Sequence, residues 1–210
     1  MPSRATTSVT PFQDVGPSRA EQSAANLVVM DDSPRVFVGY ATAAGSTAGI
    51  AERIAGGLRA AGCEVVCRRA GPDLDPTAFD ALVIGSAVHN MAWLTPAVDL
   101  LSRIPIGRQR STWCLSVGGV SRQGAITRRM TAGEVRRVQR GFPTDFRPRE
   151  HRYFGGIVEM TGLPMWGRVF WQLIGGRPGD HRDWPAVDGW ARQIAAELTG
   201  VRQTAGQMRD

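Results

Sequence analysis

The sequence contains no lysine, and all 25 of its basic residues are arginines. This absence excludes mechanisms that need a lysine side chain, including the G-x-x-x-x-G-K-[ST] loop, whose lysine reaches the bound phosphates. The sequence also lacks an apolar run of 18 residues, so we expect no membrane-spanning helix. Its first residues lack the long apolar segment of a secretory signal, and we therefore expect a cytoplasmic protein.

Cysteine is scarce, with only Cys63, Cys67 and Cys114 in the whole chain. Cys63 and Cys67 lie four residues apart in a strand-like run, CEVVC, which places their side chains on one face. That spacing in a strand is not the spacing of a metal-binding knuckle. We expect buried, reduced thiols and no metal site.

The positive charge is concentrated in one stretch. Residues 118–152 contain nine arginines and three acidic residues, and nine minus three accounts for the whole net charge of +6. Such a local excess favours an anionic partner, namely lipid headgroups, an anionic substrate or nucleic acid, with a solvated arginine-rich helix as the alternative. Nucleic acid is the weakest of these candidates because no nucleic-acid motif is present and aromatic residues do not interleave with the arginines of 126–140.

The hydropathy pattern divides the chain into a tail, one domain and a second tail. Residues 1–33 are rich in Ser, Ala, Thr and Pro, and we expect a flexible N-terminal tail there. From residue 34 to residue 200 short apolar runs alternate with helical periods, which predicts a single domain. Within it, 118–152 forms a basic insertion and 159–180 an aromatic insertion, and 201–210 forms a C-terminal tail.

The alternation predicts an α/β fold with a parallel sheet. We expect strands at 35–40, 64–68, 79–88, 111–117 and 153–158, and helices at 46–61, 95–104, 126–140 and 184–198. In such folds ligands bind outside the carboxyl ends of the strands. The turns that follow Tyr40, Gly85 and Val117 are therefore the places to look for a site.

The turn after Tyr40 is rich in hydroxyl groups. Its sequence, TAAGST, lacks the G-x-G-x-x-G spacing of a dinucleotide loop, and the following strand ends in arginines where an acidic ribose ligand is expected. Thr42, Ser46 and Thr47 offer hydroxyl donors, and the N–H groups of Gly45 to Thr47 begin a helix, which favours an anion. The loop therefore suits a single phosphate held by neutral donors, as in FMN.

Three segments together resemble flavodoxin-like proteins. They are ATAAGSTAGIAERI, FDALVIGSAVHNMAWLTPAV, and YFGGIV followed by MWGRVFWQLIGG and DWPAVDGWARQIAAEL. Over residues 35–199 the chain is most similar to flavodoxin-domain proteins of the menaquinone-dependent protoporphyrinogen oxidase type. This resemblance implies a flavodoxin-like, doubly wound, five-stranded parallel sheet of order 2-1-3-4-5, with an insertion before the last helix.

The resemblance also implies the cofactor-binding residues. The phosphate loop comprises Thr42, Ala43, Ala44, Gly45, Ser46 and Thr47. Two loops flank the flavin ring, Ser86, Ala87, Val88, His89 and Asn90 in one and Ser116, Val117, Gly118 and Gly119 in the other. His89, Met91 or Trp93 is expected to cover the ring face, and His89 is a weak candidate for proton transfer. Ala44 departs from the family pattern, which often has a hydroxyl or acidic residue there.

Three candidate functions remain open. The first is an FMN-dependent oxidoreductase that passes electrons from a reduced substrate, such as protoporphyrinogen IX, to a quinone, with Arg136 and Arg137 facing the carboxylates of a tetrapyrrole. The alternative is a flavodoxin-type electron carrier without a substrate of its own, and a third is a binding module that has lost the flavin. For 163–174 we weigh an amphipathic anchor on the inner face of the cell membrane, a hydrophobic wall for the substrate, and core packing.

Overall fold

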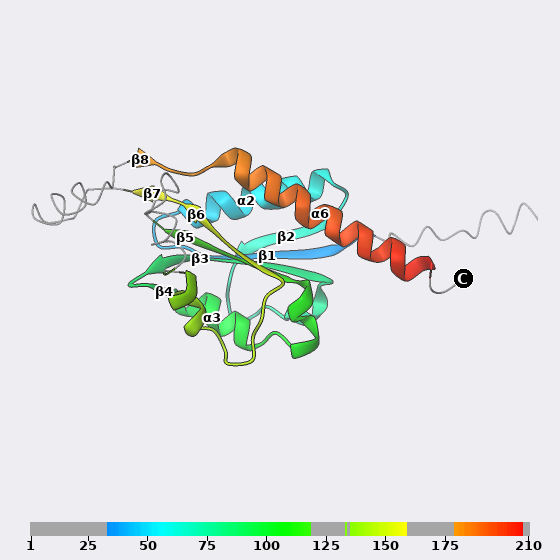
Figure 1. Ribbon diagram of the computed structural model, residues 1–210, viewed down its shortest axis with the longest axis horizontal. Helices are drawn as coiled ribbons and strands as arrows, with labels where there is room; N and C mark the ends of the chain where they lie inside the picture. Colours follow the sequence, from blue (N-terminus) through cyan, green and yellow to red (C-terminus); the bar gives the residue numbers. More distant parts are fainter. Residues whose placement is uncertain (1–32, 119–132, 134, 159–178, 208–210) are drawn as a thin grey trace, which may run out of the picture. The chain divides into compact units, whose positions relative to one another are not determined.

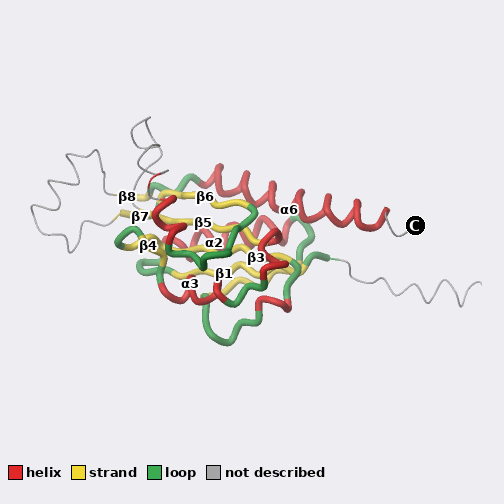
Figure 2. The backbone as a smooth tube through the Cα atoms, turned by 60° about the horizontal axis from the view of Figure 1, so that its bottom comes forward, coloured by secondary structure: helices red, strands yellow, loops and turns green. Residues whose placement is uncertain are grey.

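Five parallel strands form the centre of the protein. The computed structural model describes residues 33–118, 133, 135–158 and 179–207, all within the unit Ser33–Asp210. The strands are β1 (Arg35–Ala41), β2 (Glu64–Arg69), β3 (Ala81–His89), β5 (Thr112–Gly118) and β6 (Glu150–Gly155). They lie side by side in the order β2-β1-β3-β5-β6 (Figures 1 and 2), which confirms the predicted order 2-1-3-4-5.

Helices cover both faces of this sheet. α2 (Ser46–Ala60) and α6 (Trp184–Gln207) lie next to each other on one face, and α3 (Thr95–Ser102) lies on the other (Figure 1). The central strands are therefore buried on both sides, which explains why β3 is an unbroken apolar run rather than an alternating one. The stripe of Ile50, Ile54 and Leu58 faces the core, as its four-residue spacing predicts.

α2 and α6 contact each other at two small residues. A Cβ atom added to Gly57 would lie 2.9 Å from Cβ of Ala191, so a larger side chain at either position would push the helices apart. Trp190 and Ile194 fill the space beside this contact and are fully buried. α6 continues to Gln207, beyond the predicted end at Leu198.

The predicted strand at 153–158 is split in two. β6 begins earlier, at Glu150, and ends at Gly155, whereas β7 (Ile157–Val158) turns away to pair with β8 (Gly179–Asp180) in an antiparallel ribbon. The backbone of Gly155 passes close to the residue that follows β8. A Cβ atom added to Gly155 would lie 2.4 Å from the carbonyl oxygen of His181. β6 ends at this close contact.

Some predictions fall on residues outside the described part of the chain. They concern the N-terminal tail, most of the 126–140 helix and the aromatic segment 163–174. Of the 126–140 helix, the structure describes residue 133 and the helical segment 135–140. No helix among the described residues is both long and apolar enough to cross a membrane.

The three cysteines face the core, as predicted. Cys63 and Cys114 are buried, Cys67 is half-buried, and no disulfide joins them. Cys63 and Cys67 belong to the same apolar cluster, beneath α2 and α6, as expected for their shared face. Burial raises the pKa of the Cys67 and Cys114 thiols, which keeps both in the neutral form.

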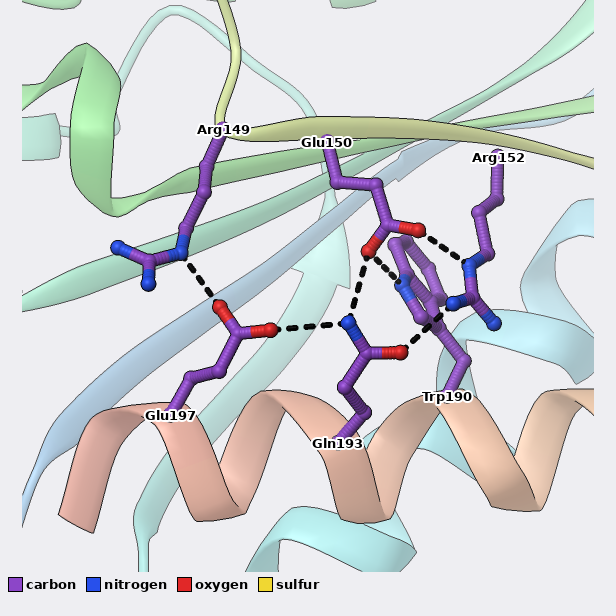
Figure 3. A network of polar contacts seen from close by, with 6 residues as sticks. All are labelled: Arg149, Glu150, Arg152, Trp190, Gln193 and Glu197. Atoms are coloured by element: carbon purple, nitrogen blue, oxygen red, sulfur yellow. Dashed lines mark hydrogen bonds and ion pairs between the residues drawn. The ribbon is translucent and has the colours of Figure 1, made fainter. Parts of the chain in front are cut away.

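A polar network joins the edge strand β6 to α6 (Figure 3). Glu150 is its centre, because its carboxylate accepts hydrogen bonds from Trp190 Nε1 at 2.8 Å and from Arg152 Nε at 2.6 Å. Gln193 accepts from Arg152 Nη2 at 2.6 Å and donates to Glu197 at 2.9 Å, and Arg149 pairs with Glu197. Since Trp190 is fully buried, Glu150 is the group that satisfies the indole N–H.

We predict that Glu150→Ala lowers the free energy of unfolding by about 2 kcal/mol, because it leaves the buried Trp190 N–H without an acceptor and Arg152 without its carboxylate. Urea unfolding measures the change. Glu197→Ala is the matched control, since it removes a carboxylate from the outer end of the network and is expected to cost less than about 1 kcal/mol. Equal losses in the two variants would contradict the central role of Glu150.

Candidate functional site

The turn between β1 and α2 has the shape of an anion-binding loop. Gly45 lies in the left-handed region, with φ 90°, and its N–H donates to Thr42 Oγ1 at 2.9 Å. This bond closes the turn, and glycine meets its conformational demand without strain. Ala43, Ala44 and Gly45 are exposed at the carboxyl edge of the sheet, where a ligand has access to their backbone.

Within the described part of the chain, the amino end of α2 has no side-chain cap. Gly45 stands at the N-cap position, and the first turn of the helix contains no acidic residue. The first N–H groups of a helix have no acceptor within the helix, and the helix dipole adds partial positive charge at this end. A phosphate placed here would accept hydrogen bonds from these N–H groups, and its negative charge would interact favourably with the helix dipole.

Thr47 is the most informative residue in this loop. The residue is 0% exposed, and its Oγ1 has no hydrogen-bond partner among the described residues. A buried hydroxyl without a partner costs roughly 1–3 kcal/mol, so native proteins rarely keep one without a reason. Thr47 lies in the first turn of α2, a position at which a bound anion would provide an acceptor.

Ser46 has a partner that the sequence did not indicate. Its Oγ accepts a hydrogen bond from the Ile157 N–H at 3.0 Å, which ties the loop to the start of β7. The hydroxyl keeps its own proton, so it can still donate to an anion. No local pattern signals this contact, since the two residues are 111 positions apart.

The second predicted loop is a tight β-hairpin. β3 pairs antiparallel with β4 (Ala92–Trp93), and the two residues between the strands, Asn90 and Met91, have φ values of 50° and 61°. Such positive values match the two-residue turns that suit the twist of a hairpin. His89, Asn90 and Met91 are exposed at its tip, so His89 and Met91 remain available to cover a ring. Arg137 donates to the Met91 sulfur from the helical segment 135–140.

Ser86 and Trp93 hold this hairpin in place. Ser86 is fully buried, and its hydroxyl donates to the Ala87 carbonyl at 2.9 Å and accepts from the Leu94 N–H at 3.0 Å. Trp93 is only 6% exposed and donates from Nε1 to Ser116 Oγ at 2.8 Å. The prediction of Trp93 as a possible ring cover is therefore wrong, because pairing with Val88 turns its side chain into the core.

The third loop follows β5 and is shaped by a tyrosine. Ser116 and Val117 are buried and Gly118 is half-buried, whereas Gly119 lies outside the described residues. A Cβ atom on Gly118 would lie 1.8 Å from the Tyr153 hydroxyl, so Gly118 must be glycine for Tyr153 to pack there. The sequence suggested that this glycine serves close approach of a ligand, but within the described structure the neighbour that demands it is a side chain.

A chain of polar contacts leads from the helical segment 135–140 to the end of β5. The Gln139 amide contacts His151 Nδ1 at 3.1 Å, and His151 Nε2 contacts Ser116 Oγ at 2.9 Å, beside the Trp93 indole. If Gln139 donates to Nδ1, the ring proton is on Nε2 and is donated to Ser116. Burial lowers the pKa of His151 to about 4, so the ring is neutral near pH 7. Sequence reasoning missed His151, because a lone histidine in a basic strand carries no signal.

The three loops leave the carboxyl ends of β1, β3 and β5, which are neighbours in the sheet. The site thus combines neutral donors for a phosphate at one end with the exposed hairpin tip and the glycine-containing turn further along. Within the described residues no group of three or more His, Cys, Asp or Glu side chains is placed to hold a metal ion. The arrangement suits an organic phosphate monoester whose remaining part lies along the sheet edge.

Comparison with known protein families gives one match. A model described as a flavodoxin domain matches residues 37–183, which include all three loops. The comparison with curated proteins gives no match.

Solved structures with a similar fold include two flavodoxins and a larger oxidoreductase. The flavodoxin of Streptococcus pneumoniae TIGR4 is 12% identical, with a TM-score of 0.48, and covers 78% of this chain and 99% of its own. Flavodoxin 2 of Bacillus cereus is 19% identical, with a TM-score of 0.46 and coverages of 78% and 99%. The rubredoxin:oxygen oxidoreductase of Desulfovibrio gigas is 18% identical, with a TM-score of 0.47, and this chain covers 37% of its length.

We predict that His151 makes stability depend on pH below neutrality. The unfolded chain takes up a proton near pH 6.5, whereas the folded protein resists it until about pH 4. The free energy of unfolding should therefore fall as the pH drops from 6.5 to 4, by about 3 kcal/mol, and this contribution should level off below that range. Urea unfolding at each pH measures it.

His151→Gln should remove this part of the slope, whereas His89→Gln, which changes an exposed histidine, should retain it. An identical slope in the wild type and His151→Gln would show that other groups cause the acid sensitivity.

Proposed function

This chain belongs to the flavodoxin domain family, and from that premise we propose that it binds FMN at residues 42–47 and transfers electrons as a flavodoxin-type carrier. The observation that carries the proposal is the buried hydroxyl of Thr47, which has no partner among the described residues and lies in the first turn of the uncapped α2. A phosphate monoester supplies the acceptor that this hydroxyl and the helix N–H groups lack.

The residues around the loop fit each part of the cofactor. Thr47, Ser46 and the α2 backbone hold the phosphate through neutral donors, and the left-handed Gly45 keeps the loop backbone turned toward it. The hairpin tip at 89–91 and the turn at 116–118 flank the ring. FMN supplies the electron-accepting ring system, while the protein binds and orients it and limits its contact with water.

A second candidate is an oxidoreductase that takes electrons from its own reduced substrate, of the protoporphyrinogen IX type, and passes them to a quinone. The observation that favours it is the position of the two ends of the aromatic insertion. Ile157, just before the insertion, contacts Ser46, and Arg182, just after it, lies against Gly49, where an added Cβ would be 2.8 Å from Nη1. Both ends of the aromatic insertion are thus held near the phosphate loop and the start of α2. The apolar composition of the insertion suits an apolar electron acceptor. Contact of 163–174 with a membrane surface remains a prediction for residues outside the described part.

We predict that Thr47→Val weakens FMN binding by about 10- to 100-fold, because it removes one hydrogen bond to a charged phosphate. Fluorescence titration of the apoprotein with FMN measures the dissociation constant. The stability of the apoprotein should stay the same or rise, since a methyl group replaces a buried hydroxyl that has no partner. This combination separates a ligand contact from a structural role.

Thr199→Val is the matched control, because Thr199 lies on α6 and its hydroxyl donates to the carbonyl oxygens of Ala195 and Ala196 in the same helix. Its dissociation constant for FMN should stay within about twofold of the wild type. The same small change in Thr47→Val would refute phosphate binding by Thr47.

The carrier and the oxidoreductase differ in their reaction with a quinone. We predict that the photoreduced, FMN-loaded protein reacts with menadione no faster than free reduced FMN, as expected of a carrier without a quinone site. Stopped-flow absorbance under anaerobic conditions measures the rate. A rate at least tenfold above that of free reduced FMN, together with anaerobic flavin reduction by protoporphyrinogen IX, would favour the oxidoreductase.

A further inference from the structure

A half-buried arginine lies against the first turns of α2. Nη1 of Arg182 is 2.8 Å from the position that a Cβ atom added to Gly49 would take. Gly49 is one helical turn from Gly45, and its N–H donates to the Gly45 carbonyl oxygen at 3.2 Å. Because Cβ atoms tilt toward the amino end of a helix, the guanidinium group lies beside the turn that begins at Gly45. Arg182 therefore places a positive charge next to the phosphate loop at 42–47.

Two neighbours fix the position of this guanidinium group. The Asp180 carboxylate accepts hydrogen bonds from Arg182 Nε at 2.8 Å and from Nη2 at 2.6 Å, and Cζ of Arg182 lies 4.6 Å from the centroid of the Trp184 ring. The hydrogen bonds hold the pKa of Asp180 well below its usual value, so both members of the pair are ionised near neutral pH. They leave Nη1, the nitrogen over Gly49, without a hydrogen-bond partner among the described residues.

The two charges of this pair differ in their contact with water. The Asp180 side chain is 45% exposed, whereas that of Arg182 is 18% exposed. Since water and salt screen an exposed charge more than a shielded one, the carboxylate cancels only part of the field that Arg182 produces at α2. The nearby Asp183 serves another helix, because its carboxylate accepts from the Ala186 N–H at 3.0 Å in the first turn of α6.

A positive charge beside the amino end of a helix is unfavourable, because the helix dipole is itself positive there. The first turn of α2 contains no acidic residue that would offset this interaction, and Gly45 offers no side chain as a cap. A phosphate bound at 42–47 would interact favourably with both the dipole and Arg182. Arg182 thus distinguishes a ligand that brings negative charge to this loop from one that does not.

We propose that Arg182 determines the preference of this site for a phosphorylated flavin over an unphosphorylated one. The inference rests on the proposed binding of FMN at 42–47 and adds to it the residue that sets the charge preference. The neutral donors of the loop hold the phosphate oxygens, whereas Arg182 acts from outside the loop through its charge. Riboflavin has the same ring and side chain as FMN but lacks the phosphate, so only FMN binding should respond to Arg182.

Fluorescence titration of the full-length apoprotein with FMN and with riboflavin at low ionic strength tests this role. Arg182→Gln should weaken FMN binding by about three- to tenfold, because it removes an attraction to the phosphate charge. Its dissociation constant for riboflavin should stay within about twofold of the wild type, which also shows that the variant is folded. Arg182→Lys keeps the charge and should restore most of the FMN affinity.

The salt dependence gives an independent measurement of the same interaction. The difference in FMN affinity between the wild type and Arg182→Gln should shrink as the salt concentration rises from about 0.02 M to about 0.5 M, because salt screens the attraction. A difference that does not change with salt would show that the charge of Arg182 is not responsible.

Arg53→Gln is the matched control. Arg53 lies one turn further along α2 than Gly49, has its Cζ 5.8 Å from the Trp184 ring, and pairs with Asp188 at 2.6 Å. The variant therefore removes the same charge from the same helix and the same ring, and its FMN affinity should stay within about twofold of the wild type.

Three results would overturn the role of Arg182 while leaving FMN binding intact. They are an unchanged FMN affinity in Arg182→Gln, an equal weakening by Arg182→Gln and Arg53→Gln, and an equal loss of FMN and riboflavin affinity in Arg182→Gln. Failure of the wild-type protein to bind either flavin would instead refute the proposed function, and this inference with it.

Discussion

The register of the parallel strands determines where the loops of the candidate site emerge from the sheet. Ala41 of β1 pairs with Ser86 of β3, Ser86 pairs with Ser116 of β5, and Ser116 pairs with Tyr153 of β6. These four residues form a row across the sheet, close to its carboxyl edge. Because the strands are parallel and in this register, the turns that follow β1, β3 and β5 must emerge together, and a ligand that contacts one of them is within reach of the next.

The two serines of this row act as internal anchors. Ser86 binds the Leu94 N–H behind the hairpin, and Ser116 accepts from Trp93 and contacts His151. Both hydroxyls are fully buried, so each is committed to a protein partner and neither is directed to solvent. The exposed tip at His89 and Asn90 is therefore held by contacts on its inner side, and its shape does not require a bound ring.

The sequence predicted the sheet and the phosphate loop because both depend on local patterns. Apolar runs, four-residue stripes and the TAAGST turn are visible over a few residues, and they were sufficient for the strands and for the position of Thr47. The strand order came from the resemblance to flavodoxin-like proteins. The contacts that arrange the site join residues far apart in sequence, as between Ser46 and Ile157 or between Ser116 and His151, and no local pattern encodes them. Trp93 shows the same limit, since its burial depends on the antiparallel pairing of a two-residue strand.

The placement of charge sets the phosphate loop apart from the arginine-rich part of the chain. The phosphate loop contains only neutral donors and no acidic residue in the first turn of its helix, so it needs no arginine to hold one phosphate. Arg136, Arg140 and Arg147 instead line a groove together with Phe142 and Phe146. The arginine-rich stretch is therefore separate from the phosphate loop, whose fit for an anion depends on backbone N–H groups, hydroxyl groups and the helix dipole.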